Sequence, residues 1–240
     1  MMRLLLKASV AKEPKYPKQN EDALRISLSS GAIALSDGAS ESFDSRRWAK
    51  LLVTMFIRNP TISPQWLEDA VLAYSAVCDL SALTWSQAAA YERGTYATLI
   101  GIRYSAASRE LHVSAVGDSI CALAGKASAV RTFPYDDPKQ FGQRPELLST
   151  LRRYNEGLVA SGALGSQVTW DLRGLITPVL ICMTDALGEW FLKSEASGED
   201  AIAQLAACKT ESDFTALVLH LRSTGRIKVD DTTVAIVELP

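Results

Sequence analysis

Histidine is scarce in this chain of 240 residues, and its cysteines are not arranged in pairs. The two histidines, His112 and His220, lie in the apolar segments ELHVSAV and LVLHLRS, where we expect structural roles. The four cysteines are scattered, without a C-x-x-C spacing, as expected of reduced, buried thiols in a cytoplasmic protein. A Ser-His-Asp or Cys-His hydrolase therefore has few residues available, and zinc chemistry is nearly excluded.

Long apolar runs and an excess of positive charge are also missing. The longest apolar run, LITPVLICM at 175–183, contains a proline and is far shorter than the roughly 20 residues of a membrane span. The opening MMRLLLKAS has too few consecutive leucines for a secretory signal. A net charge of −2 disfavours a broad basic face for nucleic acid or anionic lipid. We therefore expect a cytoplasmic protein without a nucleic-acid or membrane partner.

The chain does have alternating groups of strand-like and helix-like segments, and we expect one domain over residues 1–240. The apolar patterns predict strands at 2–9, 23–29, 32–36, 167–173, 178–183 and 232–238. Four further β-rich runs between 94 and 133 predict an antiparallel meander. Helices are predicted at 45–58, from Ser63 onward, near 145–153, and at 186–194, 198–207 and 211–224. Runs of strands followed by runs of helices indicate an α+β layered domain.

The predicted helix after Ser63 has the clearest pattern. Ser63 is an expected N-cap, with Pro64 at the first helical position. Apolar residues follow at helical spacing and are expected to be buried: Trp66, Leu67, Ala70, Val71, Tyr74 and Val77.

Carboxylates recur where the predicted core strands begin or end. The acidic positions are Glu21 and Asp22 in NED, Asp37 in SDG, Asp118 in VGDS, Asp185 in MTDAL, and Asp230 and Asp231 in VDDTTV. A single one of these fits an ordinary turn, because Asp-Gly is a common turn sequence. Together, unpaired carboxylates at the rim of one core repel each other, and too few cations stand near them in the sequence. A bound metal ion would neutralise them.

Ligands that are all oxygen select hard cations, which means Mg²⁺ or Mn²⁺ in a cytoplasmic protein, with Ca²⁺ also compatible. Carboxylates from separate strands suit a two-ion site, in which ions ~4 Å apart bridge and activate a water and clamp a phosphoryl group. This chemistry requires neither histidine nor a covalent nucleophile. The sequence therefore predicts hydrolysis of a phosphate ester.

The ordered motifs resemble those of the protein phosphatase 2C family, the metal-dependent serine/threonine protein phosphatases, in a compact bacterial-type form. They extend through nearly the whole chain: NED at 20–22, SDG at 36–38, GTYATL at 94–99, VGDS at 116–119, CMTDAL at 182–187 and DDTTVAIV at 230–237. The resemblance implies a four-layer α-β-β-α sandwich, with two antiparallel sheets face to face and helices outside. It places the metals at one end of the sandwich.

The resemblance also implies a role for each acidic position. Asp37 would bridge two Mn²⁺ or Mg²⁺ ions, one of which the carbonyl of Gly38 would also contact. Asp185 and Asp230 would complete the shell of the other ion, so that Asp37, Asp185 and Asp230 are the implied catalytic residues.

Three further acids have supporting roles by the same resemblance. Glu21 would reach one ion through water, with Asp22 supporting it, and Asp118 would help to hold a third, weaker ion. Asp231 occupies a position where relatives often have a neutral amide, so only Asp230 of this pair should be indispensable.

Two positions depart from the family pattern. Pro17 stands where relatives usually carry an arginine that binds the substrate phosphate, which leaves Lys18 as the expected phosphate-binding residue and Lys15 as the other nearby cation. A lysine attracts phosphate as a point charge but does not reproduce the arginine fork. Ala186 replaces the usual glycine after Asp185, a change that costs about 1 kcal/mol only if the position requires a positive φ.

The expected activity is hydrolysis of phosphoserine or phosphothreonine in proteins, by a monomer whose partners are a phosphorylated protein and a cognate serine/threonine kinase. The alternative is a weak or inactive phosphatase-like binding or regulatory module, which the missing arginine favours and the intact acids disfavour. A haloacid-dehalogenase-type phosphatase would need Asp-x-Asp after an early strand, and Asp37-Gly38-Ala39 does not supply it. Residues 134–166, in the place of the family's variable flap, are expected to be irregular and to form a contact surface.

Overall fold

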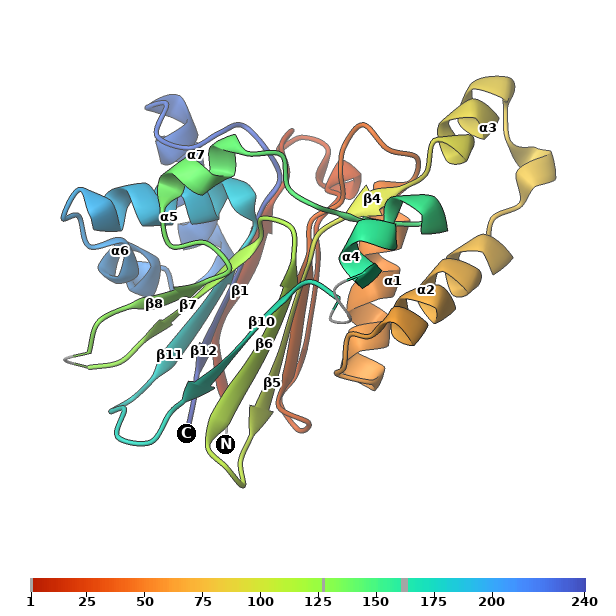
Figure 1. Cartoon of the computed structure of the whole chain (residues 1–240). Coiled ribbons are helices and arrows are strands. Elements are labelled where there is room, and N and C mark those ends of the chain that lie inside the picture. Colours follow the sequence, from red (N-terminus) through yellow and green to blue (C-terminus); the bar gives the residue numbers. More distant parts are fainter. Residues whose placement is uncertain (1, 127, 161–163) are drawn as a thin grey trace.

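The computed structural model describes residues 2–126, 128–160 and 164–240, and its centre is a pair of antiparallel sheets packed face to face (Figure 1). The first sheet has the order β1 (Arg3–Val10), β12 (Thr232–Glu238), β11 (Val179–Met183), β7 (Ile120–Ala124) and β8 (Arg131–Phe133). The second sheet has the order β10 (Ser166–Asp171), β6 (Glu110–Val116), β5 (Leu99–Ser105), β3 (Ala32–Ser36) and β2 (Ala23–Ser27). A short pair outside both sheets joins β4 (Tyr96–Ala97) to β9 (Leu148–Ser149).

Helices cover the outer faces of both sheets, as Figure 1 shows. The first sheet is covered by α5 (Asp185–Ala196), α6 (Ala201–Ala207) and α7 (Glu211–Ser223). The second is covered by α1 (Ser45–Arg58) and α2 (Pro64–Ala76), with α4 (Glu156–Ala160) beside them. The short α3 (Trp85–Glu92) projects away from the sandwich. The predicted α+β class and four-layer arrangement are therefore confirmed.

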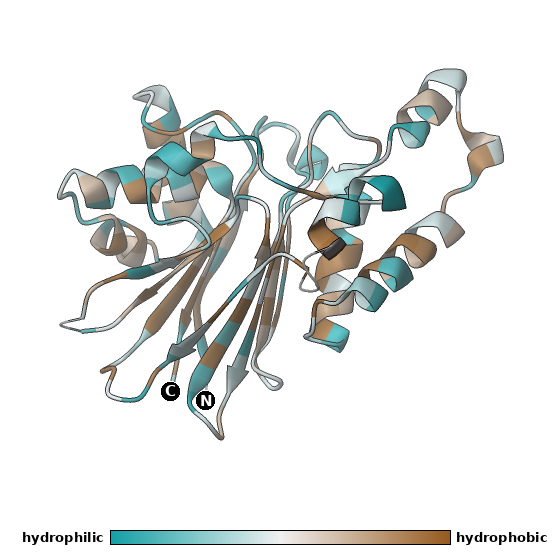
Figure 2. Ribbon diagram, viewed as in Figure 1, coloured by the Kyte–Doolittle hydropathy of each residue, from teal (hydrophilic) through white to brown (hydrophobic). Residues whose placement is uncertain are grey.

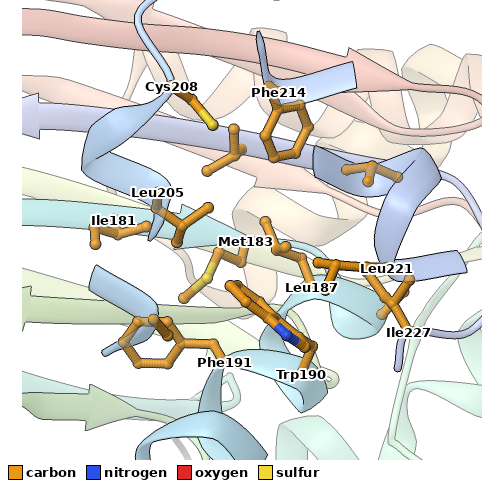
Figure 3. Packing of buried hydrophobic residues seen from close by; sticks show 14 of the residues in the cluster. Ile181, Met183, Leu187, Trp190, Phe191, Leu205, Cys208, Phe214, Leu221 and Ile227 are labelled. Atoms are coloured by element: carbon orange, nitrogen blue, oxygen red, sulfur yellow. The ribbon is translucent and has the colours of Figure 1, made fainter. Parts of the chain in front are cut away.

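Because successive side chains of a strand point to opposite faces, one strand contributes to two hydrophobic cores. In β11, Ile181 and Met183 face the helices, whereas Leu180 and Cys182 face the other sheet. Figure 2 shows the resulting apolar strands along the middle of the molecule. On the helix side, Figure 3 shows Met183 packed with aromatic and aliphatic side chains such as Trp190, Phe191, Phe214 and Leu205.

Several predicted boundaries are confirmed, including the helix at 45–58 and the final strand at 232–238. Ser63 caps α2, because its hydroxyl accepts a hydrogen bond from the Trp66 amide at 3.1 Å. Within the described residues, no helix combines the length and apolarity needed to cross a bilayer.

The predicted meander between 94 and 133 is wrong, because β5 and β6 belong to the second sheet and β7 and β8 to the first. The chain changes sheets at Gly117, whose φ of 96° breaks the strand. The helix predicted near 145–153 is also wrong: the Asn155 side chain bonds both the amide and the carbonyl of Ser149 and supports an irregular backbone.

Two further expectations about the region around α2 need correction. Val77 lies past the end of α2 and is 62% exposed, so it does not belong to the predicted buried stripe. The helix α3 was not predicted from the sequence, because it is only eight residues long and has no buried face.

Candidate active site: a carboxylate cluster at the end of the sandwich

The predicted acids lie at one end of the sandwich, opposite the two chain termini (Figure 1). In the second sheet, Ala23 pairs with Ser36, so that Asp22 and Asp37 lie next to each other beyond the paired strands. In the first sheet, β7, β11 and β12 pair in a register that brings the remaining acids to the matching end: Asp118, Asp185, Asp230 and Asp231. Because the short link between β6 and β7 joins the sheets there, the two groups of acids meet.

Asp37 is held by residues from two of the other motifs. Its amide donates to Thr98 Oγ1 at 2.9 Å, and the Thr98 amide donates to the Asp37 carbonyl at 2.8 Å. The hydroxyls of Thr98 and Ser119 share a further hydrogen bond of 2.8 Å, and both are buried. The threonine of GTYATL and the serine of VGDS therefore fix the direction in which Asp37 leaves β3.

Gly38 is required by close packing. A Cβ atom at this position would lie 2.9 Å from the Ser45 carbonyl carbon and 3.0 Å from the Glu21 carbonyl oxygen. The lack of a side chain lets the start of α1 approach the loop that carries Glu21. The Ser45 hydroxyl uses this proximity to donate a hydrogen bond to Glu21 Oε1.

Asp22 reaches from the second sheet to the first. Its Oδ2 accepts hydrogen bonds from the hydroxyls of Thr233 at 2.6 Å and Thr184 at 3.3 Å. Its Oδ1 is buried and has no hydrogen-bond partner. A buried carboxylate oxygen without a partner costs about 1–3 kcal/mol or more, so this atom is placed to receive a ligand.

Asp231 acts as a clamp between backbone segments. Its Oδ1 accepts from the Lys12 amide and its Oδ2 from the Glu21 amide, each at 2.6 Å. The residue is only 7% exposed. The two neighbouring acids of VDDTTV therefore differ: the buried Asp231 orders the loop before β2, while the side chain of Asp230 is partly exposed and lies beside Lys12.

Two lysines that the sequence did not single out lie beside the acids. Lys228 Nζ is 4.0 Å from Asp185 Oδ2 and 3.1 Å from Glu189 Oε2. Lys12 Nζ is 3.7 Å from Asp230 Oδ1. These side chains are about half exposed, so they only partly offset the negative charge of the cluster.

Five of the acids, here called the carboxylate cluster, interact electrostatically: Asp22, Asp37, Asp118, Asp185 and Asp230. Burial, followed by repulsion from neighbouring carboxylates, raises the pKa of Asp37 well above its usual value. Burial likewise raises the pKa of Asp22 and Asp185, and that of Asp118 to about 6. The carboxyl groups of Asp37 and Asp185 are within hydrogen-bonding reach of each other, as a shared proton would require.

The donor set of the cluster suits a hard divalent cation. Every donor is an oxygen, repulsion between the carboxylates helps to raise the pKa of Asp37, and Asp22 Oδ1 lacks a hydrogen-bond partner. In the described part of the chain, no three acidic, histidine or cysteine side chains have the geometry of a metal site as they stand. An ion bound at the cluster would therefore require some of these carboxylates to move from the positions that they take here.

The other predicted site residues take distinct places. Glu21 adjoins the cluster through its backbone, while its carboxylate bonds Ser45. Lys18 lies exposed on a short 3₁₀ turn, Pro17–Gln19, and its carbonyl accepts a hydrogen bond from Arg46. Ala186 belongs to the first turn of α5 and does not have a positive φ, so its departure from the family's glycine costs nothing.

The raised pKa values predict how the stability of the metal-free protein depends on pH. Asp118 titrates near 3.9 in an unfolded chain and at about 6 here, so the folded state holds its proton more tightly. The stabilisation of the folded state by this proton uptake is complete below about pH 4, and it is lost as the pH rises through about 6. Calorimetry in chelator should show Tm falling from pH 5 to 7.5, and Mn²⁺ restoring it at pH 7.5. A Tm that rises from pH 5 to 7.5 without metal would contradict the raised pKa of Asp118.

No protein-family profile matches this chain, and no curated protein matches it in sequence. Solved structures do match it over almost its whole length. A bacterial serine phosphatase has a TM-score of 0.61 at 13% identity, covering 100% of this chain and 97% of its own. The Mycobacterium tuberculosis serine/threonine phosphatase PstP/Ppp has a TM-score of 0.58 at 17% identity, and the match covers 99% of this chain and 98% of its own.

A third match bears on the metals. The catalytic domain of the serine/threonine protein phosphatase PstP in complex with two manganese ions has a TM-score of 0.55 at 13% identity. The match covers 99% of this chain and 96% of that domain. This chain therefore has the fold of these serine/threonine phosphatases.

Proposed function

We propose that this chain, which has the protein phosphatase 2C fold, is a metal-dependent phosphatase that hydrolyses phosphoserine and phosphothreonine in proteins. The observation that carries the proposal is the carboxylate cluster, in which five acids from separate strand ends meet and burial raises the pKa of four of them, Asp22, Asp37, Asp118 and Asp185. Such a cluster destabilises the metal-free protein, and binding divalent cations offsets that cost. Its position at one end of a fold shared with phosphatases supports this use.

The cluster would hold two Mn²⁺ or Mg²⁺ ions, which when bound would lower the pKa of a water between them and neutralise phosphoryl oxygens. Asp37, Asp185 and Asp230 would be the principal ligands, with the Gly38 carbonyl beside Asp37. Glu21 and Asp22 would complete the first acidic pair, and Asp118 would hold a third ion. Thr98 accepts a hydrogen bond from the Asp37 amide and Thr233 donates one to the Asp22 carboxylate, which supports these two acids in the proposed roles.

The phosphate of the substrate needs a cation outside the cluster, and Lys18 is the proposed one. Arg46 is a rival, because its guanidinium reaches the Lys18 carbonyl and its Nε is buried without a partner. Arg46 therefore lies beside the turn that contains Pro17, the position where relatives carry the phosphate-binding arginine.

Lys18→Ala is expected to raise KM severalfold and to change kcat little, because a point charge that holds the phosphate in ground and transition states alike is uniform binding. Steady-state kinetics on an aryl phosphate measure this, with the distant, exposed Lys126→Ala as the control. An unchanged KM in Lys18→Ala, together with a raised KM in Arg46→Ala, would assign the phosphate to Arg46.

The substrate would be a phosphorylated protein supplied by a serine/threonine kinase, and we propose a cytoplasmic monomer. The direct test is hydrolysis of an aryl phosphate and of a phosphoserine peptide by the purified chain with Mn²⁺ and with chelator. Turnover with Mn²⁺ and none in chelator supports the proposal. Equal turnover in both would remove the metal mechanism, whereas Mn²⁺ binding without any turnover would indicate the binding module.

A further inference from the structure

We infer that a cleft beside the carboxylate cluster binds an acidic residue of the substrate, next to the phosphorylated one. The inference rests on the proposed function, whose substrate class it narrows. The cleft, here called the arginine cleft, has a volume of about 590 Å³, within the range of ~300–1,000 Å³ typical of ligand pockets. Its lining includes Ala39, Tyr96, Tyr154 and two arginines, Arg93 and Arg144.

The arginine cleft adjoins the loop that follows Asp37. Ala39 lies two residues after Asp37, so their Cα atoms are at most about 7.6 Å apart. The Ala39 amide donates to the Tyr96 carbonyl at 3.0 Å, and Gly38 forms a β-bridge with Ala97. An extended peptide with its phosphorylated residue at the cluster can therefore enter the cleft within one or two residues.

The walls of the cleft are held in place by strand pairing and by contacts among the lining residues. The pairing of β4 with β9 ties Tyr96 to Ser149, which brings the segment around Arg144 next to the loop that follows Asp37. The rings of Tyr96 and Tyr154 lie 5.9 Å apart, and the Tyr96 hydroxyl donates to the Arg93 carbonyl at 2.8 Å. The cleft is thus formed before a ligand arrives.

The charges of the cleft select an anion. Within the described residues, Arg144 is exposed without a hydrogen bond or ion pair, and the guanidinium of Arg93 donates only to the Ala89 carbonyl. Arg153 stacks on Tyr154 at 4.9 Å and has no carboxylate within 4.0 Å either. Glu41 is the one acid that lines the cleft. Guanidinium groups without acidic partners favour Asp, Glu or a second phosphate as ligand.

The occupant that fits is therefore a substrate segment with an anionic residue near its phosphoserine or phosphothreonine. The test uses phosphoserine peptides that are identical except for one Asp, moved through the positions on either side of the phosphoserine, with an all-Ala reference. A parallel peptide carries a second phosphoserine in place of the favoured Asp and separates the two anionic sources. The variants are Arg144→Ala, Arg93→Ala and Arg144→Glu, with the exposed and distant Arg58→Ala as the control.

The native chain with Mn²⁺ is expected to prefer one Asp position by about tenfold in kcat/KM, as for one charge-assisted hydrogen bond. Arg144→Ala and Arg93→Ala should reduce this ratio to about twofold, Arg144→Glu should invert it, and Arg58→Ala should leave it intact. The ratio should also shrink at high salt, because the cleft is open to solvent.

A measurement without turnover separates this inference from the proposed function. Fluorescence anisotropy of the labelled, unphosphorylated Asp peptide reports binding to the cleft alone. Binding that depends on Arg144, in a protein that hydrolyses nothing, supports the cleft and overturns the phosphatase. Hydrolysis of every peptide at the same rate, or a preference for Asp that survives both alanine variants, overturns the arginine cleft and leaves the phosphatase standing.

Discussion

Asp37→Asn is expected to reduce kcat for Mn²⁺-dependent phosphate hydrolysis by on the order of a thousandfold or more. Asp37 interacts electrostatically with all four other acids of the cluster, so it lies at the centre of the cluster. Asparagine keeps the shape and the backbone bonds to Thr98 but removes the charge that would bridge two ions. Kinetics on an aryl phosphate across a Mn²⁺ titration measure the loss.

The control for this variant is Asp136→Asn, which neutralises an exposed acid that does not belong to the cluster. Calorimetry in chelator tests whether Asp37→Asn is folded. Because the substitution relieves repulsion between carboxylates, the variant should have a Tm at pH 7.5 equal to or above that of the native chain. Near-native kcat in Asp37→Asn would show that the cluster is not the catalytic metal site.

The adjacent acids Asp230 and Asp231 should respond oppositely to the same substitution. Asp230→Asn is expected to cut kcat by orders of magnitude, because Asp230 is a proposed ion ligand. It should lose little stability, because the Asp230 side chain is partly exposed, its ion pair with Lys12 is open to solvent, and an asparagine oxygen can still accept the hydrogen bond of the Asp231 amide. Asp231→Asn should keep most of the activity but lose about 1–3 kcal/mol of unfolding free energy. The reason is that an asparagine can accept only one of the two amide hydrogen bonds, from Lys12 and Glu21, that Asp231 now accepts.

Denaturant unfolding in chelator and turnover with Mn²⁺ give the two readouts for each variant. If the pair were a solvated turn, both variants would match the native chain in both measurements. Equal loss of activity in the two variants would instead mean that the carboxylates act jointly.

The strand-end acids could be predicted because each depends on a few neighbouring residues. An apolar run, an acid and a small residue are visible within six positions around Asp37 or Asp185. The four-layer order followed from the resemblance, and the helix at 45–58 from its periodicity. The resemblance therefore predicted the layers, and local patterns predicted the positions of the acids, whose roles stay predictions.

Features that depend on register between distant strands could not be predicted. Thr233 bonds Asp22 across 211 positions of sequence, and Lys12 meets Asp231 across 219. The distribution of β5, β6, β7 and β8 over two sheets was missed for the same reason, since a glycine break between strands has the same local pattern in a hairpin and in a crossover. The arginine cleft also assembles from segments some fifty residues apart, which no local pattern connects.

Counting the Mn²⁺ ions bound per chain tests the central claim most directly, because it does not depend on the choice of substrate. Equilibrium dialysis followed by metal analysis, on the native chain, Asp37→Asn and Asp136→Asn, provides the count. We expect two ions on the native chain and on Asp136→Asn, a third at higher Mn²⁺ that Asp118→Asn removes, and at most one on Asp37→Asn. A native chain that binds no Mn²⁺ at millimolar concentration, or an Asp37→Asn variant that binds as many ions as the native chain, would contradict this claim.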